Sequence, residues 1–433
     1  MARKQSSRTP DPQERLYIEE TPDRRSPSER DRDRILYASS FARLAEITQV
    51  VSPEKGYVFH NRLTHSLKVA QISRRIAEAL LREQPDDIDA IGGLDPNVAE
   101  AAGLAHDLGH PPFGHIAEYE LNKLTTAAGA RDGYEGNAQS FRIVAMLATS
   151  DARNAEDLPI AGLNLTRATL HSILKYPWRR GRSKPYSKKW GYYDTEEAVF
   201  NWVTQDRPPE QRSLAAEIMD WADDITFAIH DLLDFYCAGK IPIDRCKHPG
   251  SAELNRMLTG MFKRKPEWER DRQQYVEALE AIVEWFPIEA HQQYSDSSDD
   301  RAQLFDCSTG LIRHFVEAIK VRSRDELAGP LATVDPEVRR IVEVLKQFIW
   351  EYVIQSPDLA VPQQGQRLAI STVFRRLISA AEEKHWYIFP AGYRSAISQA
   401  STKHARARVV ADCISGMTEK ELLHLYRCGE GIS

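Results

Sequence analysis

The sequence has few cysteines and no pattern that would join them. Five cysteines occur in 433 residues, and no two of them form a CxxC pair. An odd number of widely spaced cysteines does not make a disulfide framework, and the lack of CxxC pairs argues against a zinc knuckle. We therefore expect free thiols in a reducing compartment and a cytoplasmic protein.

Long apolar runs are also absent. No stretch approaches the roughly 18 consecutive apolar residues that indicate a membrane-spanning helix. The first residues, Met-Ala-Arg-Lys-Gln-Ser-Ser-Arg, lack the apolar core of a secretory signal. We expect a soluble protein with no membrane partner.

Several common catalytic motifs are missing as well. The sequence contains no HExxH pair of a zinc protease, no GxxxxGKS or GxxxxGKT nucleotide loop and no GxSxG turn of a serine hydrolase. The chain also lacks an excess of positive charge. Its formal net charge of −6 gives no overall basic field for nucleic acid, although this total does not exclude local basic patches.

What is present is typical of a helical globular protein. Hydrophobic residues make up 42% of the chain and charged residues 28%, so the chain can bury a large core. Apolar residues recur at helical spacing along most of the sequence, and strand patterns are scarce. We predict an all-α fold with at most a short β-hairpin, and we expect loops at residues 291–308 and 357–365.

Residues that can carry chemistry are concentrated between positions 106 and 118. Three histidines and two carboxylates lie there around a Gly/Pro turn: His106, Asp107, His110, His115 and Glu118. Imidazole and carboxylate groups are ligands for divalent cations and the usual proton carriers near neutral pH. This stretch is the first candidate for the active site.

The preceding residues predict how the first two of these side chains are presented. Asp95 and Pro96 indicate a helix start, while Gly109 and the following prolines indicate its end. His106 and Asp107 would then lie on the last turn. Adjacent helical side chains diverge by about 100°, so further ligands to a shared ion must come from other segments.

Two other segments offer such ligands. His65 lies on the first turn of a helix predicted to run to about Arg82, and Arg62, whose guanidinium group suits phosphate oxygens, precedes it by three residues. A later helix, expected over residues 213–236, carries an acidic row on the face opposite its apolar side. The row is either a solvated surface or the wall of a cation site, and Asp223 or Asp224 is the candidate fourth ligand.

A basic and aromatic cluster spans residues 175–190. Lysines and arginines alternate there with tyrosine and tryptophan. Such a cluster can bind single-stranded nucleic acid or phosphate tails, or it can be a solvated loop. The sequence leaves both interpretations open.

Together these residues resemble the HD-domain metal phosphohydrolases, and in particular their deoxynucleoside triphosphate triphosphohydrolase (dGTPase-like) branch. The resemblance extends from about residue 30 to residue 426. The main similar segments are NRLTHS at 61–66, AHDLGHPPFGH at 105–115, YEGNAQ at 134–139, KYPW at 175–178, ADDI at 222–225 and DCISGMT at 412–418.

The resemblance implies roles for the individual residues. His65, His106, Asp107 and Asp223 match the metal ligands, and the cofactor would be a divalent ion, with Mg²⁺ and Mn²⁺ ahead of Fe, Co, Ni and Zn. His115 and Glu118 match the catalytic pair, and residues three apart adjoin on a helix. The residues that match substrate contacts are Gln49, Val50, Arg62, His110, Lys175, Phe227 and Asp231.

Within that last set the expected contacts differ. Gln49 and Asp231 would meet the sugar, Arg62 the α-phosphate, and His110 and Lys175 the phosphate chain. One position departs from the family pattern, because Phe227 stands where the family commonly has tyrosine. The hydrogen bond of a phenol is lost there, which puts the strictness of substrate choice in doubt.

The implied reaction is hydrolysis of a dNTP to deoxynucleoside and inorganic triphosphate by a homo-oligomer, for instance a hexamer, with a nucleotide activator or single-stranded DNA as further partners. Alternatives are a phosphohydrolase of nucleoside monophosphates, cyclic nucleotides or nucleic-acid ends, and a non-catalytic nucleotide or single-stranded DNA binder. We expect a flexible charged segment at 1–30, the HD core at 31–240, and a helical region at 241–433 that completes the substrate site and the oligomer contacts.

Overall fold

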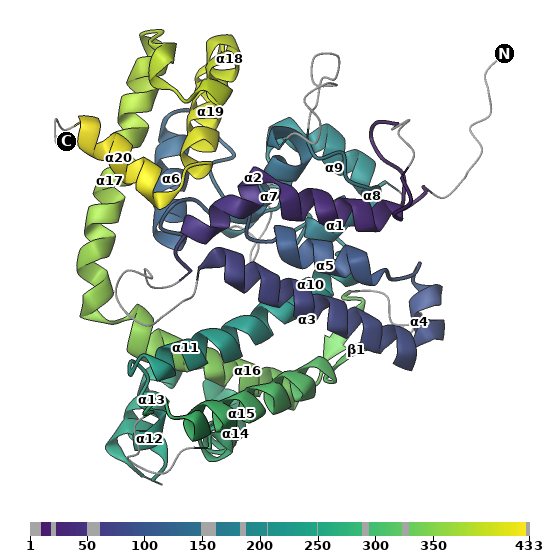
Figure 1. Ribbon diagram of the computed structural model, residues 1–433, viewed down its shortest axis with the longest axis vertical. Helices are drawn as coiled ribbons and strands as arrows, with labels where there is room; N and C mark the ends of the chain where they lie inside the picture. Colours follow the sequence, from purple (N-terminus) through teal and green to yellow (C-terminus); the bar gives the residue numbers. More distant parts are fainter. Residues whose placement is uncertain are drawn as a thin grey trace.

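The computed structural model describes residues 10–18, 23–49, 61–148, 162–181, 188–205, 207–248, 250–287, 294–322 and 329–429 (Figure 1). Val50, one of the predicted substrate contacts, lies outside the described residues. Gln49, which precedes it, is described.

The elements follow one another along the chain as a succession of helices interrupted by one pair of strands. The α-helices and strands are α1 (Pro27–Tyr37), α2 (Ser39–Ala42), α3 (Arg62–Glu83), α4 (Pro85–Ala90), α5 (Pro96–Ala105), α6 (His115–Ala127), α7 (Gly136–Arg142), α8 (Arg167–Ile173), α9 (Glu197–Val203), α10 (Leu214–Thr226), α11 (Leu232–Cys237), α12 (Ile243–Cys246), α13 (Ala252–Arg264), α14 (Arg272–Trp285), α15 (Ser298–Val316), β1 (Ile319–Val321), β2 (Ala332–Val334), α16 (Pro336–Ile349), α17 (Pro357–Glu382), α18 (Ala391–Gln399), α19 (Lys403–Ser415) and α20 (Glu419–Gly429). Short 3₁₀ or π-helical turns are η1 (Arg43–Glu46), η3 (Ile143–Leu147), η6 (Asp194–Glu196), η7 (Phe227–Asp231), η8 (Pro266–Asp271), η10 (Trp350–Ile354) and η11 (Trp386–Ile388).

The prediction of an all-α fold with at most a short hairpin is confirmed. In the described part of the chain the only sheet is the antiparallel pair of β1 and β2, in which Lys320 lies opposite Thr333. Among the same residues, no helix combines the length and the apolar character needed to cross a bilayer.

Three helices at the centre of the molecule position the predicted metal ligands. α5 packs against α3, and α10 packs against both (Figure 1). As predicted, Asp95 begins α5: its side chain accepts the N–H of Asn97, and Pro96 takes the first helical position. Asn61 caps α3 by accepting the N–H of Thr64 at 3.0 Å. These caps fix where the helices start, and so which side chains face the centre.

The buried side chains form separate apolar clusters. The largest lies among α3, α10, α14 and α16 and includes Val69 and Ile225. Another joins α6 to the C-terminal helices α17, α19 and α20, which gather at one end of the molecule (Figure 1). Phe113, just ahead of α6, is buried in that second cluster, so the C-terminal helices pack directly against the segment that leads into His115.

The loop predicted at 357–365 is wrong, and the loop predicted at 291–308 is wrong from Ser298 onwards; residues 294–297 are not helical, and residues 291–293 lie outside the described residues. Residues 357–365 begin α17, where Pro357 suits the first position of a helix and Pro362, one turn later, removes only one backbone donor. Residues 298–308 belong to α15, whose first turn is capped by Ser297 and carries Asp299 and Asp300. Acidic residues at a helix N-terminus are favoured by the helix dipole, so the polar run that we interpreted as a loop is a helix start.

The N-terminal segment contacts the core at several points. α1 begins at Pro27, behind the cap of Ser26, inside the region expected to be flexible. Arg15 pairs with Thr166 as an isolated bridge and lies 2.6 Å from the buried carboxylate of Asp31. These contacts attach part of the charged segment to α1 and α8.

Candidate functional site

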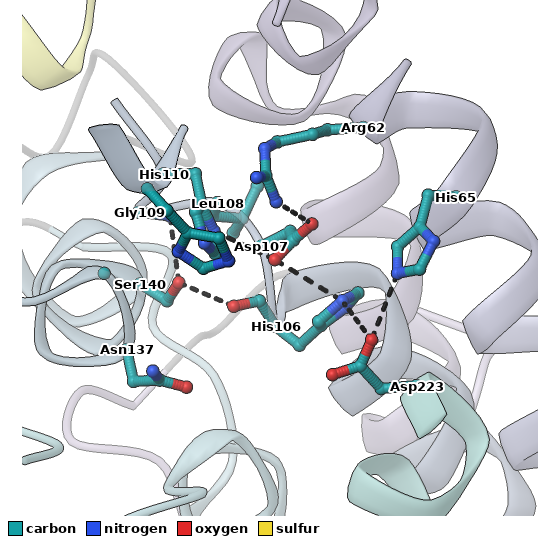
Figure 2. Close-up of polar contacts among 12 residues, drawn as sticks. Arg62, His65, His106, Asp107, Leu108, Gly109, His110, Asn137, Ser140 and Asp223 are labelled. Atoms are coloured by element: carbon teal, nitrogen blue, oxygen red, sulfur yellow. Dashed lines mark hydrogen bonds and ion pairs between the residues drawn. The ribbon is translucent and has the colours of Figure 1, made fainter. Parts of the chain in front are cut away.

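His106 is presented at the end of α5 with its two ring nitrogens in different roles. Its Nδ1 lies 2.7 Å from the carbonyl oxygen of Gly103. A carbonyl only accepts, so Nδ1 carries a proton, and in the neutral ring Nε2 has a free lone pair. Nε2 lies 3.5 Å from Asp107 Oδ1 and 3.8 Å from Asp223 Oδ1 (Figure 2).

His65 approaches the same point from α3. Its Nε2 lies 3.1 Å from Asp223 Oδ1, and its ring centroid is 5.6 Å from that of His106 (Figure 2). One ligand atom from each of His65, His106 and Asp107 lies within 4.8 Å of the others. The structure thus brings together the four residues expected to bind metal, from α3, the end of α5, and α10.

The residues present fit a divalent cation. His106 Nε2 is buried and makes no hydrogen bond, although two carboxylate oxygens lie near it. A lone pair that faces anionic oxygens away from water is unfavourable unless positive charge lies between them. Two imidazoles and two carboxylates form a mixed nitrogen and oxygen donor set, which suits several divalent metals.

The electrostatic surroundings of His65 also favour a cation at this site. Burial lowers the pKa of His65, but the carboxylates of Asp223 and Asp231 outweigh burial and raise that pKa to about 10. The pKa of Asp223 is held well below its usual range, since Lys175 and His65 outweigh its burial. The site therefore stabilises positive charge.

The acidic row of α10 is neutralised from other elements. Lys175 Nζ lies 2.7 Å from Asp220 Oδ1 and 3.1 Å from Asp223 Oδ2, and Lys346 pairs with Asp224 at 2.5 Å. Of the two candidate fourth ligands, Asp223 is the one beside His65. Lys175, which we expected to reach a triphosphate, instead contacts Asp220 and Asp223 in this structure.

Arg62 and His110 both contact Asp107. Arg62 donates to Asp107 Oδ2 at 2.7 Å, and His110 Nδ1 lies 2.9 Å from Asp107 Oδ1. Burial raises the pKa of Asp107, but Arg62 and the neighbouring histidines hold it well below its usual range. Burial and the charge of Arg62 lower the pKa of His110 to about 4, so its ring is neutral near pH 7.

Close backbone packing explains the glycine in the HDLGH segment. A Cβ on Gly109 would lie 2.1 Å from the carbonyl oxygen of Gly136, so no larger residue fits there. Gly109 N–H donates to Ser140 Oγ at 2.9 Å, and that hydroxyl donates to the carbonyl of His106 (Figure 2). α7 thus holds the segment that carries His106 and Asp107.

The predicted catalytic pair forms at the start of α6. His115 Nδ1 lies 2.9 Å from Glu118 Oε2; the His115 side chain is 72% exposed and that of Glu118 only 10%. Burial raises the pKa of Glu118, but the hydrogen bond from His115 and the charge of Lys189 outweigh it and hold the pKa well below its usual range. An ionised Glu118 accepts the Nδ1 proton, which leaves His115 Nε2 as the atom that can exchange protons with a substrate.

Lys189 and Glu135 belong to this arrangement, and the sequence did not single them out as site residues. Lys189 Nζ lies 3.0 Å from Glu118 Oε1 and 2.9 Å from Glu135 Oε1. The signals were the general basic character of residues 175–190 for Lys189 and the YEGNAQ segment for Glu135. Neither signal indicates their pairing, which spans more than fifty residues and is set by the tertiary fold.

The other predicted substrate contacts lie at different depths. Asp231 is buried, and its Oδ1 lies 3.7 Å from His65 Nδ1, on the far side of that ring from Asp223. Phe227 is half-buried against the main core. Gln49 is half-buried, and its Oε1 is a buried atom without a hydrogen bond.

The two tryptophans of the basic and aromatic cluster do not lie on an open binding surface. Trp178 and Trp190 are buried with Ala138 and Tyr193, and Trp178 donates to the carbonyl of Lys189. Buried indoles cannot stack on the bases of a single strand. Residues 182–187 of the cluster lie outside the described residues.

Two family models match parts of this chain. The HD domain family matches residues 62–228, which contain the four predicted metal ligands and the His115–Glu118 pair. A phosphohydrolase-associated domain matches residues 332–428.

Three relatives carry the name deoxyguanosinetriphosphate triphosphohydrolase-like protein. The protein of Streptomyces coelicolor is 34% identical over 93% of this chain and 92% of its own length. That of Corynebacterium efficiens is 34% identical over 95% and 93%, and that of Vibrio vulnificus 28% identical over 94% and 93%. The chain therefore belongs to the deoxyguanosinetriphosphate triphosphohydrolase-like family of HD-domain phosphohydrolases.

Proposed function

We propose that this protein is a metal-dependent dNTP triphosphohydrolase, which hydrolyses dGTP or another dNTP to deoxynucleoside and inorganic triphosphate. The observation that carries the proposal is the convergence of His65, His106, Asp107 and Asp223 at one point, with the exposed His115 on the adjoining helix. The names of the relatives support the choice of substrate class.

We assign the metal to the first four of these residues. A divalent cation held there, Mg²⁺ or Mn²⁺ in the first place, supplies positive charge that polarises phosphate oxygens. Asp107 and Asp223 are kept ionised by Arg62 and Lys175, and the Nδ1 proton of His106 is fixed by Gly103. Such outer contacts orient the ligands before any ion arrives.

His115 is the group that moves the proton. With Nδ1 held by Glu118, its Nε2 either protonates the departing O5′ of the deoxynucleoside or accepts the proton of the attacking water. Glu118 stabilises the charged ring, and Lys189 keeps Glu118 ionised. His110, neutral and 5.1 Å away between ring centroids, adds no competing charge.

The substrate contacts remain predictions from the resemblance. Arg62, beside Asp107, would also spread the negative charge that develops on the α-phosphate. We assign Asp231 a second task, because its place behind His65 suits a residue that orients the ring. Gln49 would meet the sugar, and Phe227 would pack against it.

Product analysis tests the proposal. The purified protein is incubated with each dNTP, with dGMP and with a cyclic nucleotide, in Mg²⁺ or Mn²⁺, and the phosphorus products are separated by ³¹P NMR. We expect inorganic triphosphate from at least one dNTP. Orthophosphate from dGMP alone, or no hydrolysis of any dNTP, would overturn the proposal in favour of another phosphohydrolase activity or a non-catalytic binder. The oligomeric state, a nucleotide activator, single-stranded DNA binding and the cytoplasmic location stay predictions.

A further inference from the structure

Glu419, the first residue of α20, connects the C-terminal helices to two segments of the site. Its Oε1 accepts the N–H of Thr48 at 2.7 Å and the N–H of Phe113 at 3.1 Å. Its Oε2 accepts the hydroxyl of Thr48 at 2.9 Å. One half-buried carboxylate thus binds two backbone segments separated by more than sixty residues.

α20 does not need Glu419 for its own N-terminal cap. Thr418 Oγ1 accepts the N–H of Glu421, and the Glu421 side chain accepts the N–H of Thr418 at 2.7 Å. This reciprocal pair is a complete capping box. The carboxylate of Glu419 therefore serves the contacts with Thr48 and Phe113.

The segment that contains Phe113 leads directly into His115. Phe113 has φ +68°, an unfavourable backbone conformation for a bulky residue that persists only where the surroundings hold it. Its ring is buried among C-terminal side chains, and its N–H is held by Glu419. The C-terminal helices thus fix the backbone conformation two residues before the proton-transferring histidine.

Arg43 adds a second contact between the same regions. Its buried guanidinium donates to the carbonyls of Leu108 and His110 and to the carbonyl of Met417, ahead of α20. The turn between the metal ligands and His115 is therefore held at both ends. Arg43, which also contacts Met417, holds its start, and Glu419 of the C-terminal segment holds its end.

The segment that contains Thr48 leads into Gln49. Thr48 pairs with Asn61 as an isolated bridge, and Asn61 is the cap of the helix that carries Arg62 and His65. Holding Thr48 at both its N–H and its hydroxyl fixes the backbone next to the residue expected to meet the sugar.

We propose that Glu419 is a positioning residue for the hydrolytic site, which sets the backbone ahead of His115 and of Gln49 at the same time. The inference rests on the proposed function. Loss of Glu419 should lower kcat, because His115 is no longer held in place, and raise KM, because the segment with Gln49 is freed. A misplacement of catalytic groups by about 1 Å can cost on the order of 100-fold in rate.

The test compares Glu419→Ala, Glu419→Gln and Lys420→Ala in the full-length protein, with kcat, KM, bound Mn²⁺ and the melting temperature measured for each. Glu419→Ala removes all three contacts, and we expect kcat to fall about 10-fold or more and KM to rise severalfold, with Mn²⁺ still bound. Glu419→Gln keeps an oxygen for the two N–H groups and an amide donor for the Thr48 hydroxyl, so it should restore most of both constants. Lys420, on the same helix turn, is the control that changes neither, because its ion pair with Glu46 at 3.4 Å is exposed to solvent and contributes little.

The outcomes separate this inference from the proposed function. If the unaltered protein hydrolyses no dNTP, the proposed function fails, and Glu419 is not the reason. If it hydrolyses a dNTP and Glu419→Ala lowers only kcat, in proportion to a loss of folded protein, Glu419 is merely structural. Failure of Glu419→Gln to restore KM would also overturn the positioning role.

Discussion

Gly103 of α5 lies against the backbone of Ala70 in α3, so that a Cβ on Gly103 would come within 2.6 Å of the Ala70 Cα. The two helices carry ligands to the same point, because His65 is in α3 and His106 ends α5. Their close packing at Gly103 therefore helps to set the separation of the two imidazoles.

Substitution of Gly103 by alanine should push the two helices apart. We expect a loss of about 1–3 kcal/mol in the free energy of unfolding, measured by urea denaturation, and weaker metal binding. Gly310→Ala is the matched control, since α15 leaves open space around that position and alanine favours a helix by up to about 1 kcal/mol. Equal effects of the two substitutions would show that α3 and α5 are not in backbone contact.

His115→Ala should separate proton transfer from metal binding. The substitution removes the proton-transferring ring and leaves the four proposed ligands in place, so we expect turnover to fall about 10²–10⁴-fold. Bound Mn²⁺, measured by electron paramagnetic resonance, should stay the same. Loss of the metal together with activity would contradict this division of roles.

Lys189→Met should move the acid limb of the pH–activity profile to higher pH. Lys189 lowers the pKa of Glu118, so its removal raises that pKa. Glu118 then takes up a proton at a higher pH and no longer holds His115 in its active state. Lys189→Arg should keep the original profile, as should Lys188→Met, its exposed neighbour. An unshifted profile for Lys189→Met would rule out a role for this ammonium group.

Local signals in the sequence predicted the helical class and the start of α5, where Asp95 stands directly ahead of the helix and caps it by accepting a backbone N–H. In the structure, Asn61 and Asp335 cap α3 and α16 in the same way. Similar residue types misled us at residues 298–308 and 357–365, because acidic residues and a proline at the first helical position are as acceptable in a helix start as in a loop.

The metal set could be predicted because its residue types are distinctive, whereas the supporting contacts could not. Lys189, Glu135 and Glu419 are ordinary surface residue types, and what gives them a task is a partner far away in the sequence. The burial of Trp178 and Trp190 likewise follows from tertiary packing, which a local mixture of basic and aromatic residues does not reveal.

His171 should make stability fall in mild acid. Burial and the charge of Arg207 lower its folded-state pKa to about 4, against about 6.5 for an unfolded histidine. As the pH falls through 6.5 the unfolded chain binds this proton first, so stability is lost progressively down to pH 4. Between pH 7 and 4.5 the unaltered protein should lose about 2 kcal/mol more unfolding free energy than His171→Gln.

Urea denaturation at both pH values checks this difference. His171 is buried and its Nε2 lies 3.2 Å from the carbonyl of Gln211, whereas His314 is exposed. His314→Gln should therefore keep the pH dependence of the unaltered protein. The same dependence in His171→Gln would mean that His171 takes up its proton in the folded state as readily as in the unfolded one.

The central claim is that four side chains from three helical segments share one cation. Titration with Mn²⁺, followed by electron paramagnetic resonance, tests it most directly in the unaltered protein and in His65→Ala, Asp107→Ala and Asp223→Ala. We predict one tightly bound Mn²⁺ per chain, weakened at least 10-fold by each substitution and unchanged by Lys420→Ala. Unaltered Mn²⁺ affinity in Asp107→Ala and Asp223→Ala, with the fold intact, would contradict the account.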